Sequence, residues 1–391
     1  MNLEATRAKF EELYERADGE FFFAPGRVNL IGEHTDYNGG HALPCALDLG
    51  TCAMAAPRGD GHLGLFSLNL FRGDESPRLK FKTDRLSPNS SYGWRAYPLG
   101  VAWDLEKKLG PIPGADILFN GDLPGGAGLS SSASIEVLTA YILNTFHELG
   151  LSLTELALVG QEAENNFVGV NSGIMDQFAS ANCRPGHGLL LNCETLACQY
   201  IPINLNQASL WVVDSGKRRG LADSKYNERR AECEAALERV NQTIDRRFKS
   251  FGEMSQAELD ALSPLIEDDT LLKRARHAVS ENLRTLAAAK ALSEGDLEAF
   301  GLLMNASHIS LRDDYEVTGP EMDALVQAAW KQPETLGARM TGAGFGGCAV
   351  VLRGPAIDRD YQARLSTDYR AATGLAPDFH QVRPAGGVRR L

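Results

Sequence analysis

The stretch Leu123-Pro124-Gly125-Gly126-Ala127-Gly128-Leu129-Ser130-Ser131-Ser132-Ala133-Ser134 joins a glycine-rich loop to a run of serines. Residues 115–119 before it are typical of a strand, and apolar residues at helical spacing follow over 135–149. Backbone N–H groups at the start of a helix attract anions, and glycines leave those groups unobstructed. The stretch therefore predicts a phosphate-binding turn between a strand and a helix, with hydroxyls suited to magnesium.

A second polar loop lies near the N-terminus and reads Ala24-Pro25-Gly26-Arg27-Val28-Asn29-Leu30-Ile31-Gly32-Glu33-His34-Thr35-Asp36-Tyr37-Asn38-Gly39-Gly40. The apolar run Phe21-Phe22-Phe23 before it predicts a strand that enters a tight loop. Connecting loops carry binding and catalytic residues more often than core residues. Several charges between glycines therefore indicate a functional site here.

Two further segments follow the phosphate-binding turn. Residues 152–167 predict a helix, because Ser152 and Glu155 form a capping box before an apolar stripe, with Glu164 off that stripe. Next comes Asn171-Ser172-Gly173-Ile174-Met175-Asp176-Gln177, where Ser172 is expected to cap a short helix. That helix would carry Asp176 in its first turn.

The last glycine-rich segment is Arg339-Met340-Thr341-Gly342-Ala343-Gly344-Phe345-Gly346-Gly347-Cys348, which runs into the apolar residues 349–352. Residues 342–347 match GxGxxG, but a dinucleotide-binding turn opens a helix, whereas a strand is expected here. We therefore interpret the segment as a second anion-binding loop. The chain has no GxxxxGK[ST] sequence, which argues against a P-loop fold.

Bulk composition limits the classes of function. A length of 391 residues predicts two to three domains or lobes. A net charge of −12 disfavours a nucleic-acid partner, because Lys and Arg drive binding to phosphate backbones. No segment approaches the roughly 18 apolar residues that span a bilayer, and the first residues lack a secretory pattern. We therefore expect a cytoplasmic protein without a membrane role.

The seven cysteines predict reduced thiols rather than a disulfide framework, since their number is odd and no CxxC pair occurs. Cys183, His187, Cys193 and Cys198 are candidate zinc ligands. Their spacing matches no common zinc finger or ribbon. We therefore do not expect a zinc site.

The polar segments together resemble the galactokinases of the GHMP small-molecule kinase superfamily. Residues 26–37 are similar to the galactokinase signature, and residues 126–134 and 340–347 are similar to two motifs shared by the superfamily. Further similarity lies in residues 161–165, 167–171, 173–177 and 226–230. The resemblance spans nearly the whole chain.

This resemblance implies an α+β fold of two domains with the active site in the cleft between them. Residues 1–205 would form an N-terminal galactose- and nucleotide-binding domain like domain 2 of ribosomal protein S5. Residues 206–391 would form a ferredoxin-like C-terminal GHMP kinase domain. The implied activity is transfer of the γ-phosphoryl group of ATP to the anomeric hydroxyl of galactose with Mg²⁺, and we expect a monomer.

The resemblance also implies roles for individual residues. The sugar site would comprise Glu33, His34, Thr35, Asp36, Gly173, Asp176 and Tyr226. The ATP site would comprise Gly126, Ala127, Gly128, Leu129, Ser130, Ser131 and Ser132, with Trp94 and Tyr97 near adenine. Ser132 and Glu164 would hold Mg²⁺, and Arg27 and Asp176 would be catalytic. Ionised carboxylates only accept hydrogen bonds, which suits a ring of sugar hydroxyls.

The expected position of Asp176 bears on its chemistry. A helix N-terminus and a nearby arginine both favour the ionised carboxylate, which makes it a weak base. We therefore expect Asp176 to orient the sugar hydroxyl and to accept its proton late. The chain also departs from the family pattern, because Asp214 stands where galactokinases commonly have asparagine. His41 replaces a frequent aromatic residue and is expected to be structural.

Two other functions remain open from the sequence. A kinase for a related sugar, such as N-acetylgalactosamine, would share the residues that handle phosphate. A non-catalytic sensor of galactose and ATP would be expected to have an eroded phosphate loop. The intact run Ser130-Ser131-Ser132-Ala133 argues against such a sensor.

Overall fold

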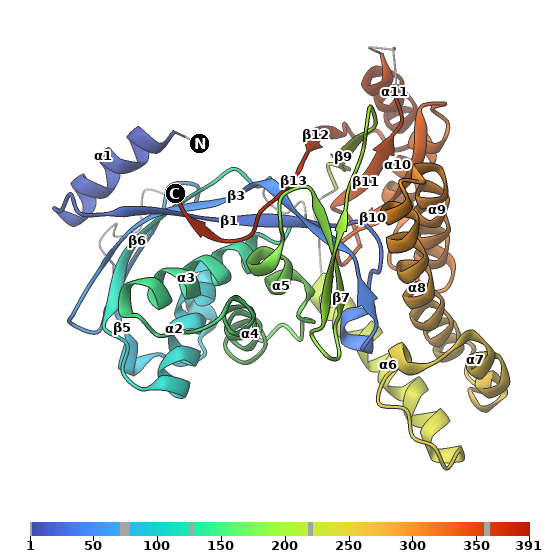
Figure 1. The fold of residues 1–391 in the computed structure, drawn as a ribbon, viewed down its shortest axis with the longest axis horizontal. Helices are drawn as coiled ribbons and strands as arrows, with labels where there is room; N and C mark the ends of the chain where they lie inside the picture. The colour runs from blue at the N-terminus through green and yellow to red at the C-terminus, as the bar shows by residue number, and fades with distance from the viewer. Residues whose placement is uncertain (1, 71–78, 125–127, 218–221, 356–359) are drawn as a thin grey trace.

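The computed structural model describes residues 2–70, 79–124, 128–217, 222–355 and 360–391. Its elements fall into two lobes, one formed mainly by the N-terminal half and one by the C-terminal half (Figure 1). Within the described residues, a larger sheet has seven strands and two smaller sheets have four and three strands. No described helix is long and apolar enough to cross a membrane.

The larger sheet forms the first lobe, in the strand order β14-β1-β3-β6-β4-β5, with β13 paired to β3. Among its described strands, β4 and β6 pair in parallel and the other pairs are antiparallel. The strands are β1 (Glu20–Asn29), β3 (Pro44–Pro57), β4 (His62–Ser67), β5 (Lys80–Lys82), β6 (Gly114–Gly121), β13 (Pro384–Ala385) and β14 (Arg389–Arg390).

Side chains alternate between the two faces of this sheet along each strand. Helices cover both faces. Met54 and Leu118 pack with α1 (Leu3–Tyr14) on one face. Ala53 and Ile117 belong to the cluster on the opposite face, which carries the other helices of this lobe (Figure 1). Those helices are α2 (Ala96–Leu109), α3 (Ser131–His147), α4 (Leu153–Ala163) and α5 (Met175–Asn182).

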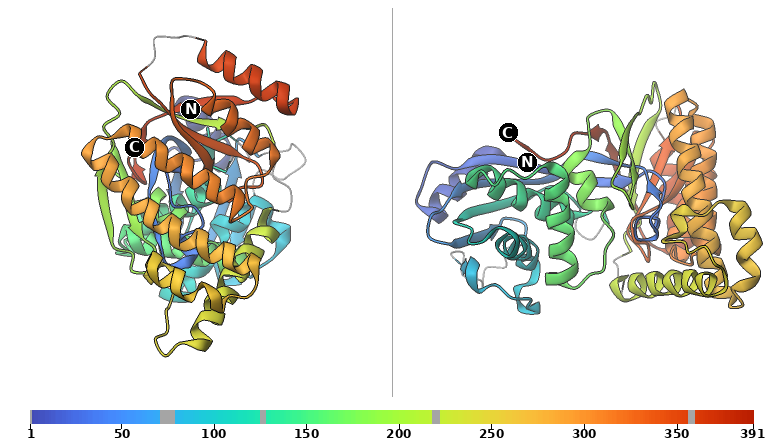
Figure 2. Two further views of the ribbon diagram at one scale, coloured as in Figure 1. Left: turned by 90° about the vertical axis from the view of Figure 1, so that its right-hand side faces the viewer. Right: turned by 60° about the horizontal axis from the view of Figure 1, so that its bottom comes forward.

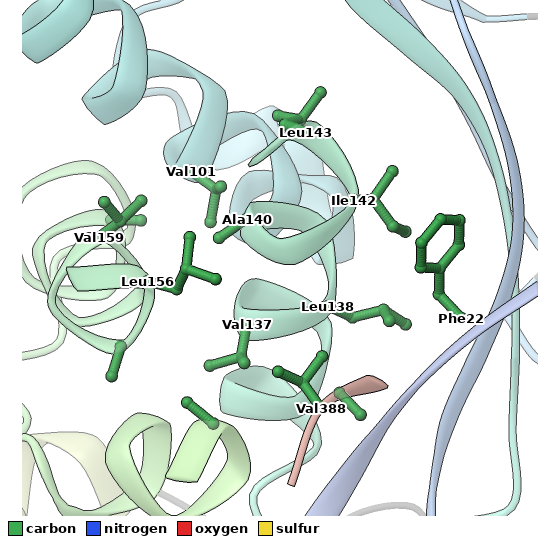
Figure 3. Packing of buried hydrophobic residues seen from close by; sticks show 14 of the residues in the cluster. Phe22, Val101, Val137, Leu138, Ala140, Ile142, Leu143, Leu156, Val159 and Val388 are labelled. Carbon is green, nitrogen blue, oxygen red and sulfur yellow. The ribbon is translucent and has the colours of Figure 1, made fainter. Parts of the chain in front are cut away.

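Helix α3 lies at the centre of this second face. Leu138 and Ile142 point toward Phe22 of β1, whereas Val137 faces Leu156 of α4 (Figure 3). These residues are almost fully excluded from water, so the hydrophobic effect fixes the helix against the sheet. The serine-rich start of α3 is thereby held at one end of the first lobe.

The second lobe is built on an antiparallel sheet in the strand order β10-β11-β9-β12. Helix α9 packs on β10, and α8 lies beside α9 on the outside of the lobe (Figures 1 and 2). The strands are β9 (Ser209–Asp214), β10 (Thr335–Thr341), β11 (Cys348–Arg353) and β12 (Asp378–Val382). The helices are α6 (Ala222–Thr243), α7 (Gln256–Leu262), α8 (Asp269–Glu294), α9 (Leu297–Asp313), α10 (Pro320–Trp330) and α11 (Tyr361–Thr373).

A third sheet connects the lobes, in the order β2 (His41–Ala42), β7 (His187–Asn192) and β8 (Cys198–Pro202). Helix α8 contacts both β2 and β8. The C-terminal segment crosses back to the larger sheet, where β13 pairs with β3 and β14 pairs with β1. The domain boundary at residues 205 and 206 stays a prediction.

The predicted start of one helix is confirmed, whereas its end and the end of one strand differ from the prediction. The capping box of Ser152 and Glu155 is present at the start of α4. The predicted helix over 152–167 divides, since α4 ends at Ala163 and a π-helical turn, η4 (Glu164–Val168), follows. Strand β1 runs through Asn29, beyond the loop start expected at residue 24, because β3 supplies backbone partners there.

Candidate active site

A cavity of about 250 Å³ brings together most residues predicted for the site. The predicted residues that line it are Arg27, Glu33, His34, Asp36, Tyr97, Gly128, Leu129, Ser130, Ser131, Ser132, Glu164, Gly173, Asp176 and Tyr226. Val170, Ser172, Met175, Gly342 and Ala343 also line it. Gly126 and Ala127 lie outside the described residues.

Arg27 and Asp176 form a bidentate ion pair in this cavity. Arg27 Nε donates to Asp176 Oδ1 at 2.7 Å, and Arg27 Nη2 donates to Oδ2 at 2.6 Å. The Ser130 hydroxyl donates to the same Oδ2 at 2.5 Å, and Arg27 Nη1 donates to the Gly128 carbonyl at 2.9 Å. Burial lowers the pKa of Arg27, but the nearby carboxylates outweigh that effect and raise it. Arg27 is therefore a fixed cation.

Asp176 occupies the first turn of α5, as predicted. The prediction that Ser172 caps this helix is wrong, because α5 begins at Met175 with Ile174 as its N-cap residue. The Ser172 hydroxyl instead donates to Glu164 Oε2 at 2.7 Å. A capping serine stands directly before the first helical residue and accepts from a backbone N–H, whereas Ser172 lies three residues before Met175 and donates a charge-assisted hydrogen bond to Glu164.

Glu33 lies at the other end of the cavity and is only 2% exposed. Its Oε1 accepts from the Gly342 N–H at 2.6 Å and from the Thr341 hydroxyl at 3.1 Å, and lies 3.6 Å from Arg339 Nη1. Burial raises the pKa of Glu33, opposed by Arg339 and Arg27. The last glycine-rich loop, predicted to bind an external anion, thus donates its Gly342 N–H to a carboxylate of the protein.

His34 and Tyr37 are linked by a hydrogen bond of 2.8 Å between His34 Nδ1 and the Tyr37 hydroxyl. Burial lowers the pKa of His34 to about 3, so the imidazole is neutral near pH 7. His34 Nε2 is buried and has no hydrogen-bond partner among the described residues. The Tyr226 ring lies 5.5 Å from the His34 ring.

Asp36 begins the short helix η1 (Asp36–Asn38) and lies against Gly173. Burial, followed by repulsion from Asp176, raises the pKa of Asp36 to about 7. A Cβ at Gly173 would lie 2.0 Å from Asp36 Oδ2. A side chain at position 173 would therefore displace the Asp36 carboxylate, which explains the glycine.

Two predicted site residues do not line the cavity. The Thr35 hydroxyl is fully buried and lies 2.8 Å from the carbonyl oxygens of Gly32 and His41, so it shapes the loop. Trp94 packs edge-on against Phe119, with 5.8 Å between ring centroids. The roles of Thr35 in sugar binding and of Trp94 and Tyr97 in adenine binding stay predictions.

Glu164 and Ser132 form an acid and hydroxyl pair beside the ion pair. Glu164 Oε2 accepts from Ser172 Oγ and Gln177 Nε2, each at 2.7 Å. Burial raises the pKa of Glu164, whereas hydrogen bonds from Ser172, Gln177 and Ser132 oppose the shift. Mg²⁺ takes one or two protein oxygens with phosphate and water, and this pair fits that requirement. The described residues contain no larger cluster of His, Cys, Asp and Glu suited to a metal.

The two departures from the family pattern both lie outside the cavity lining. Asp214 ends β9, and its Oδ1 accepts from the Gly216 N–H at 2.9 Å. His41 Nδ1 lies 2.9 Å from Asn282 Oδ1, and Nε2 lies 3.3 Å from Asn192 Nδ2. His41 is therefore structural, as expected.

Family models match three parts of the chain. The galactokinase galactose-binding signature matches residues 8–57. The GHMP kinases N terminal domain matches residues 96–184, and the GHMP kinases C terminal model matches residues 288–363. The first segment contains Arg27, Glu33 and Asp36, and the second contains Asp176. The α+β GHMP kinase fold predicted from the sequence is confirmed.

Similarity to known proteins extends over the whole chain. A galactokinase of Lactiplantibacillus plantarum is 45% identical over 100% of both chains, and one of Exiguobacterium sibiricum is 48% identical over 98% of this chain and 96% of its own. The crystal structure of Lactococcus lactis galactokinase complexed with galactose has a TM-score of 0.95, with 41% identity and full coverage of both chains.

A likeness of fold alone extends further, to the mevalonate kinase of Methanococcus jannaschii. That structure has a TM-score of 0.62 and 19% identity, covering 95% of this chain and 100% of its own. The galactokinase signature and the full-length similarity are more specific than this shared fold. The chain therefore belongs to the galactokinase family of ATP-dependent sugar kinases.

Proposed function

We propose that this protein transfers the γ-phosphoryl group of ATP to the anomeric C1 hydroxyl of D-galactose, giving galactose 1-phosphate and ADP in the first committed step of galactose catabolism. One observation carries the assignment of the site: the Arg27–Asp176 pair lies in the same cavity as both sets of ligand-binding residues. Asp176 accepts a hydrogen bond from Ser130, which is assigned to the phosphates. The charge of Asp176 also raises the pKa of Asp36, which is assigned to the sugar.

Phosphoryl transfer requires mainly alignment of the reactants and stabilisation of the phosphate charge. Arg27 supplies a positive charge that is buried and fixed by Asp176. Its exposed fraction is 4%, so water screens that charge little. Arg27 is therefore assigned to stabilise the transferred phosphoryl group, next to the acceptor hydroxyl.

Asp176 is assigned to orient the C1 hydroxyl and to accept its proton. Both carboxylate oxygens accept hydrogen bonds from Arg27, which fixes their direction. An ionised carboxylate accepts the hydrogen bond that aligns the attacking oxygen. It takes the proton late, when the bond to the leaving ADP is largely broken.

Glu33, His34, Asp36, Gly173 and Tyr226 are assigned to the sugar. Glu33 and Asp36 accept hydrogen bonds from hydroxyls, and epimers of galactose differ in which of these acceptors stay unpaired. Thr35 contributes through the loop, since its hydroxyl contacts two backbone carbonyls.

The phosphates and the metal are assigned to the start of α3. Gly128, Leu129, Ser130, Ser131 and Ser132 would surround the phosphates, with adenine beyond Tyr97. Ser132 and Glu164 would hold Mg²⁺, which when bound neutralises charge on the phosphate oxygens. All seven cysteines are free, which fits a reducing compartment such as the cytoplasm. We expect the protein to act as a monomer.

ADP release with a panel of sugars tests the proposal. Galactose should give the highest kcat/KM, with glucose and N-acetylgalactosamine far below it. A higher kcat/KM for N-acetylgalactosamine would identify a kinase for that sugar instead. Calorimetric binding of galactose and an ATP analogue without any ADP release from ATP would identify a sensor.

A further inference from the structure

Arg339 lies outside the cavity lining, yet it is a fully buried arginine directly behind Glu33. Its Nη1 donates to the Asn29 carbonyl at 2.9 Å and lies 3.6 Å from Glu33 Oε1. Its Nε donates to Ser307 Oγ at 3.1 Å. One planar guanidinium thus joins the end of β1, helix α9 and the Glu33 carboxylate.

Glu281 of α8 continues this network on the far side of Arg339. Its Oε1 accepts from Ser307 Oγ at 2.5 Å and from the Gly32 N–H at 3.0 Å, and its Oε2 accepts from Arg284 Nε at 2.8 Å. Glu281 is fully buried, so its contacts are not exchanged for water. It therefore anchors both Ser307 and the backbone immediately before Glu33.

We infer that Arg339 is a positioning residue for sugar recognition, which holds the Glu33 carboxylate toward the galactose hydroxyls and is itself held by Ser307 and Glu281. The inference rests on the proposed function, since it takes galactose as the ligand of Glu33. A buried carboxylate without a cation would become protonated or turn away, and either change removes an acceptor. Residues of the second lobe thus determine affinity for galactose without touching it.

The charged and titratable groups around Glu33 come from several elements. Arg339 of β10 and Arg27 of β1 oppose the effect of burial on the pKa of Glu33. His277 Nε2 of α8 lies 3.1 Å from the Glu33 carbonyl oxygen, and Asp36 follows in η1. Burial keeps His277 neutral by lowering its pKa to about 4. Arg339 is therefore the cation that contacts the Glu33 carboxylate most directly from the second lobe.

Arg339→Lys tests the inference. Lysine keeps the charge, but its ammonium group cannot contact Asn29, Ser307 and Glu33 simultaneously as the planar guanidinium does. We expect KM and the calorimetric Kd for galactose to rise about 10-fold or more, with kcat within about 3-fold and KM for ATP unchanged. The acid limb of kcat/KM for galactose should move to higher pH, since Glu33 would be protonated more easily. The inference would be overturned if the variant kept the wild-type KM and Kd for galactose and the wild-type acid limb of the pH profile.

A double-mutant cycle with Glu33→Gln separates positioning from a general structural effect. If Arg339 acts through Glu33, Arg339→Lys should add little further loss of galactose affinity in the Glu33→Gln background. Fully additive losses would contradict the inference. Arg58→Lys is the matched control, because Arg58 holds the buried Asp116 at 3.0 Å and neither residue lines the cavity. It should lower Tm without raising KM for galactose.

Ser307→Ala provides a decisive second variant if Arg339→Lys does not fold. It removes the hydroxyl between Arg339 and Glu281 but buries no new charge, so the Kd for galactose should rise about 3-fold or more. An unchanged Kd would reject the inference. If the wild-type protein itself failed to bind galactose, the proposed function would fail instead, and the two failures are therefore distinguishable.

Discussion

The two ends of the cavity differ in how they are supported. At the end that we propose binds the sugar, Glu33 and His34 are almost fully buried, and Arg339 and Thr341 of β10 in the second lobe contact Glu33. At the phosphate end, Ser131 is exposed and Ser132 half-buried, and the described supports of Glu164 come from the first lobe. The proposed sugar end is therefore supported by both lobes, whereas Ser131 and Ser132 at the proposed phosphate end are reached by solvent.

This difference has a chemical reason. Discrimination among sugar epimers requires acceptors at fixed positions. A buried polar group that lacks its hydrogen-bond partner costs binding free energy, so the wrong epimer binds more weakly. A phosphate chain with its cation is recognised mainly through charge, which tolerates a more open site. We therefore expect substitutions at the two ends to separate affinity for galactose from dependence on Mg²⁺ and ATP.

The largest effect should come from Asp176, where the two ends meet. Asp176→Asn removes the negative charge that binds Arg27 and the acceptor for the hydroxyl proton. We expect kcat to fall by about 100-fold or more, measured as ADP release at saturating galactose and ATP. Retention of most of the turnover would reject its assigned role. Ser130→Ala, which removes a single contact to Asp176, should cost much less.

Glu164→Gln should affect only the phosphate end. Loss of its charge should raise the Mg²⁺ concentration for half-maximal activity by about 10-fold or more, with the Kd for galactose unchanged. Mn²⁺ binding followed by electron paramagnetic resonance gives a readout that does not depend on activity. Glu162→Gln is the control, since Glu162 is exposed. Equal losses in Mg²⁺ and galactose affinity would show that the ends are not separate.

Gly173→Ala should affect only the sugar end. The new methyl group would meet the Asp36 carboxylate, and overpacking of this kind costs about 1–3 kcal/mol. KM for galactose should rise about 5-fold to 100-fold, while KM for ATP stays constant. Gly59→Ala is a matched control, because nothing lies within 4 Å of a Cβ there. A wild-type KM in Gly173→Ala would show that Asp36 adapts freely.

The ionisation of Asp36 should make the sugar end sensitive to pH. Its pKa is raised from 3.8 to about 7 by burial and by Asp176. The unfolded chain loses this proton near pH 4 and the folded protein near pH 7, so stability falls as pH rises between these values. Asp36→Asn should therefore raise Tm at pH 8 relative to the wild type, but not below pH 4. Equal differences in Tm at both pH values would contradict this explanation.

The smallest effect is expected for Glu136→Gln, behind the phosphate end. Glu136 is fully buried and shares the amide of Gln177 with Glu164. Burial, with repulsion from Glu164, raises the pKa of Glu136 well above its usual range. The glutamine variant should keep kcat within about 3-fold, with an equal or higher Tm. A large loss of turnover would indicate that Glu136 is ionised and that the open end has a buried charged support.

The sequence predicted local features more successfully than long-range contacts. The capping box of Ser152 and the first-turn position of Asp176 follow from residues a few positions apart. The contact of Gly342 with Glu33 joins residues 309 positions apart, and no local pattern encodes it. The contact of Arg339 with Glu33 was missed for the same reason, and binding of an external anion by this loop stays a prediction.

The error at Ser172 has a related cause. Serine before a short helix is a common cap, but Glu164, which attracts its hydroxyl, comes from the π-helical turn η4. Gly128 through Ser132 line the cavity, and they were predicted because the family motif and the physical pattern agree there; their binding of phosphate stays a prediction. Trp94 was assigned by resemblance alone, and its side chain packs against Phe119 outside the described cavity lining.

The pairing of β13 and β14 with β3 and β1 has a consequence for protein synthesis. Arg389 and Arg390 pair with Phe23 and Phe22, so the first sheet lacks this edge until residue 390 has left the ribosome. Domains generally fold as units, starting from the N-terminal side. Here the first lobe cannot be completed before the second has been translated, so the edge of β1 that β14 covers stays unpaired until then, and an unpaired edge is a template for pairing with another chain.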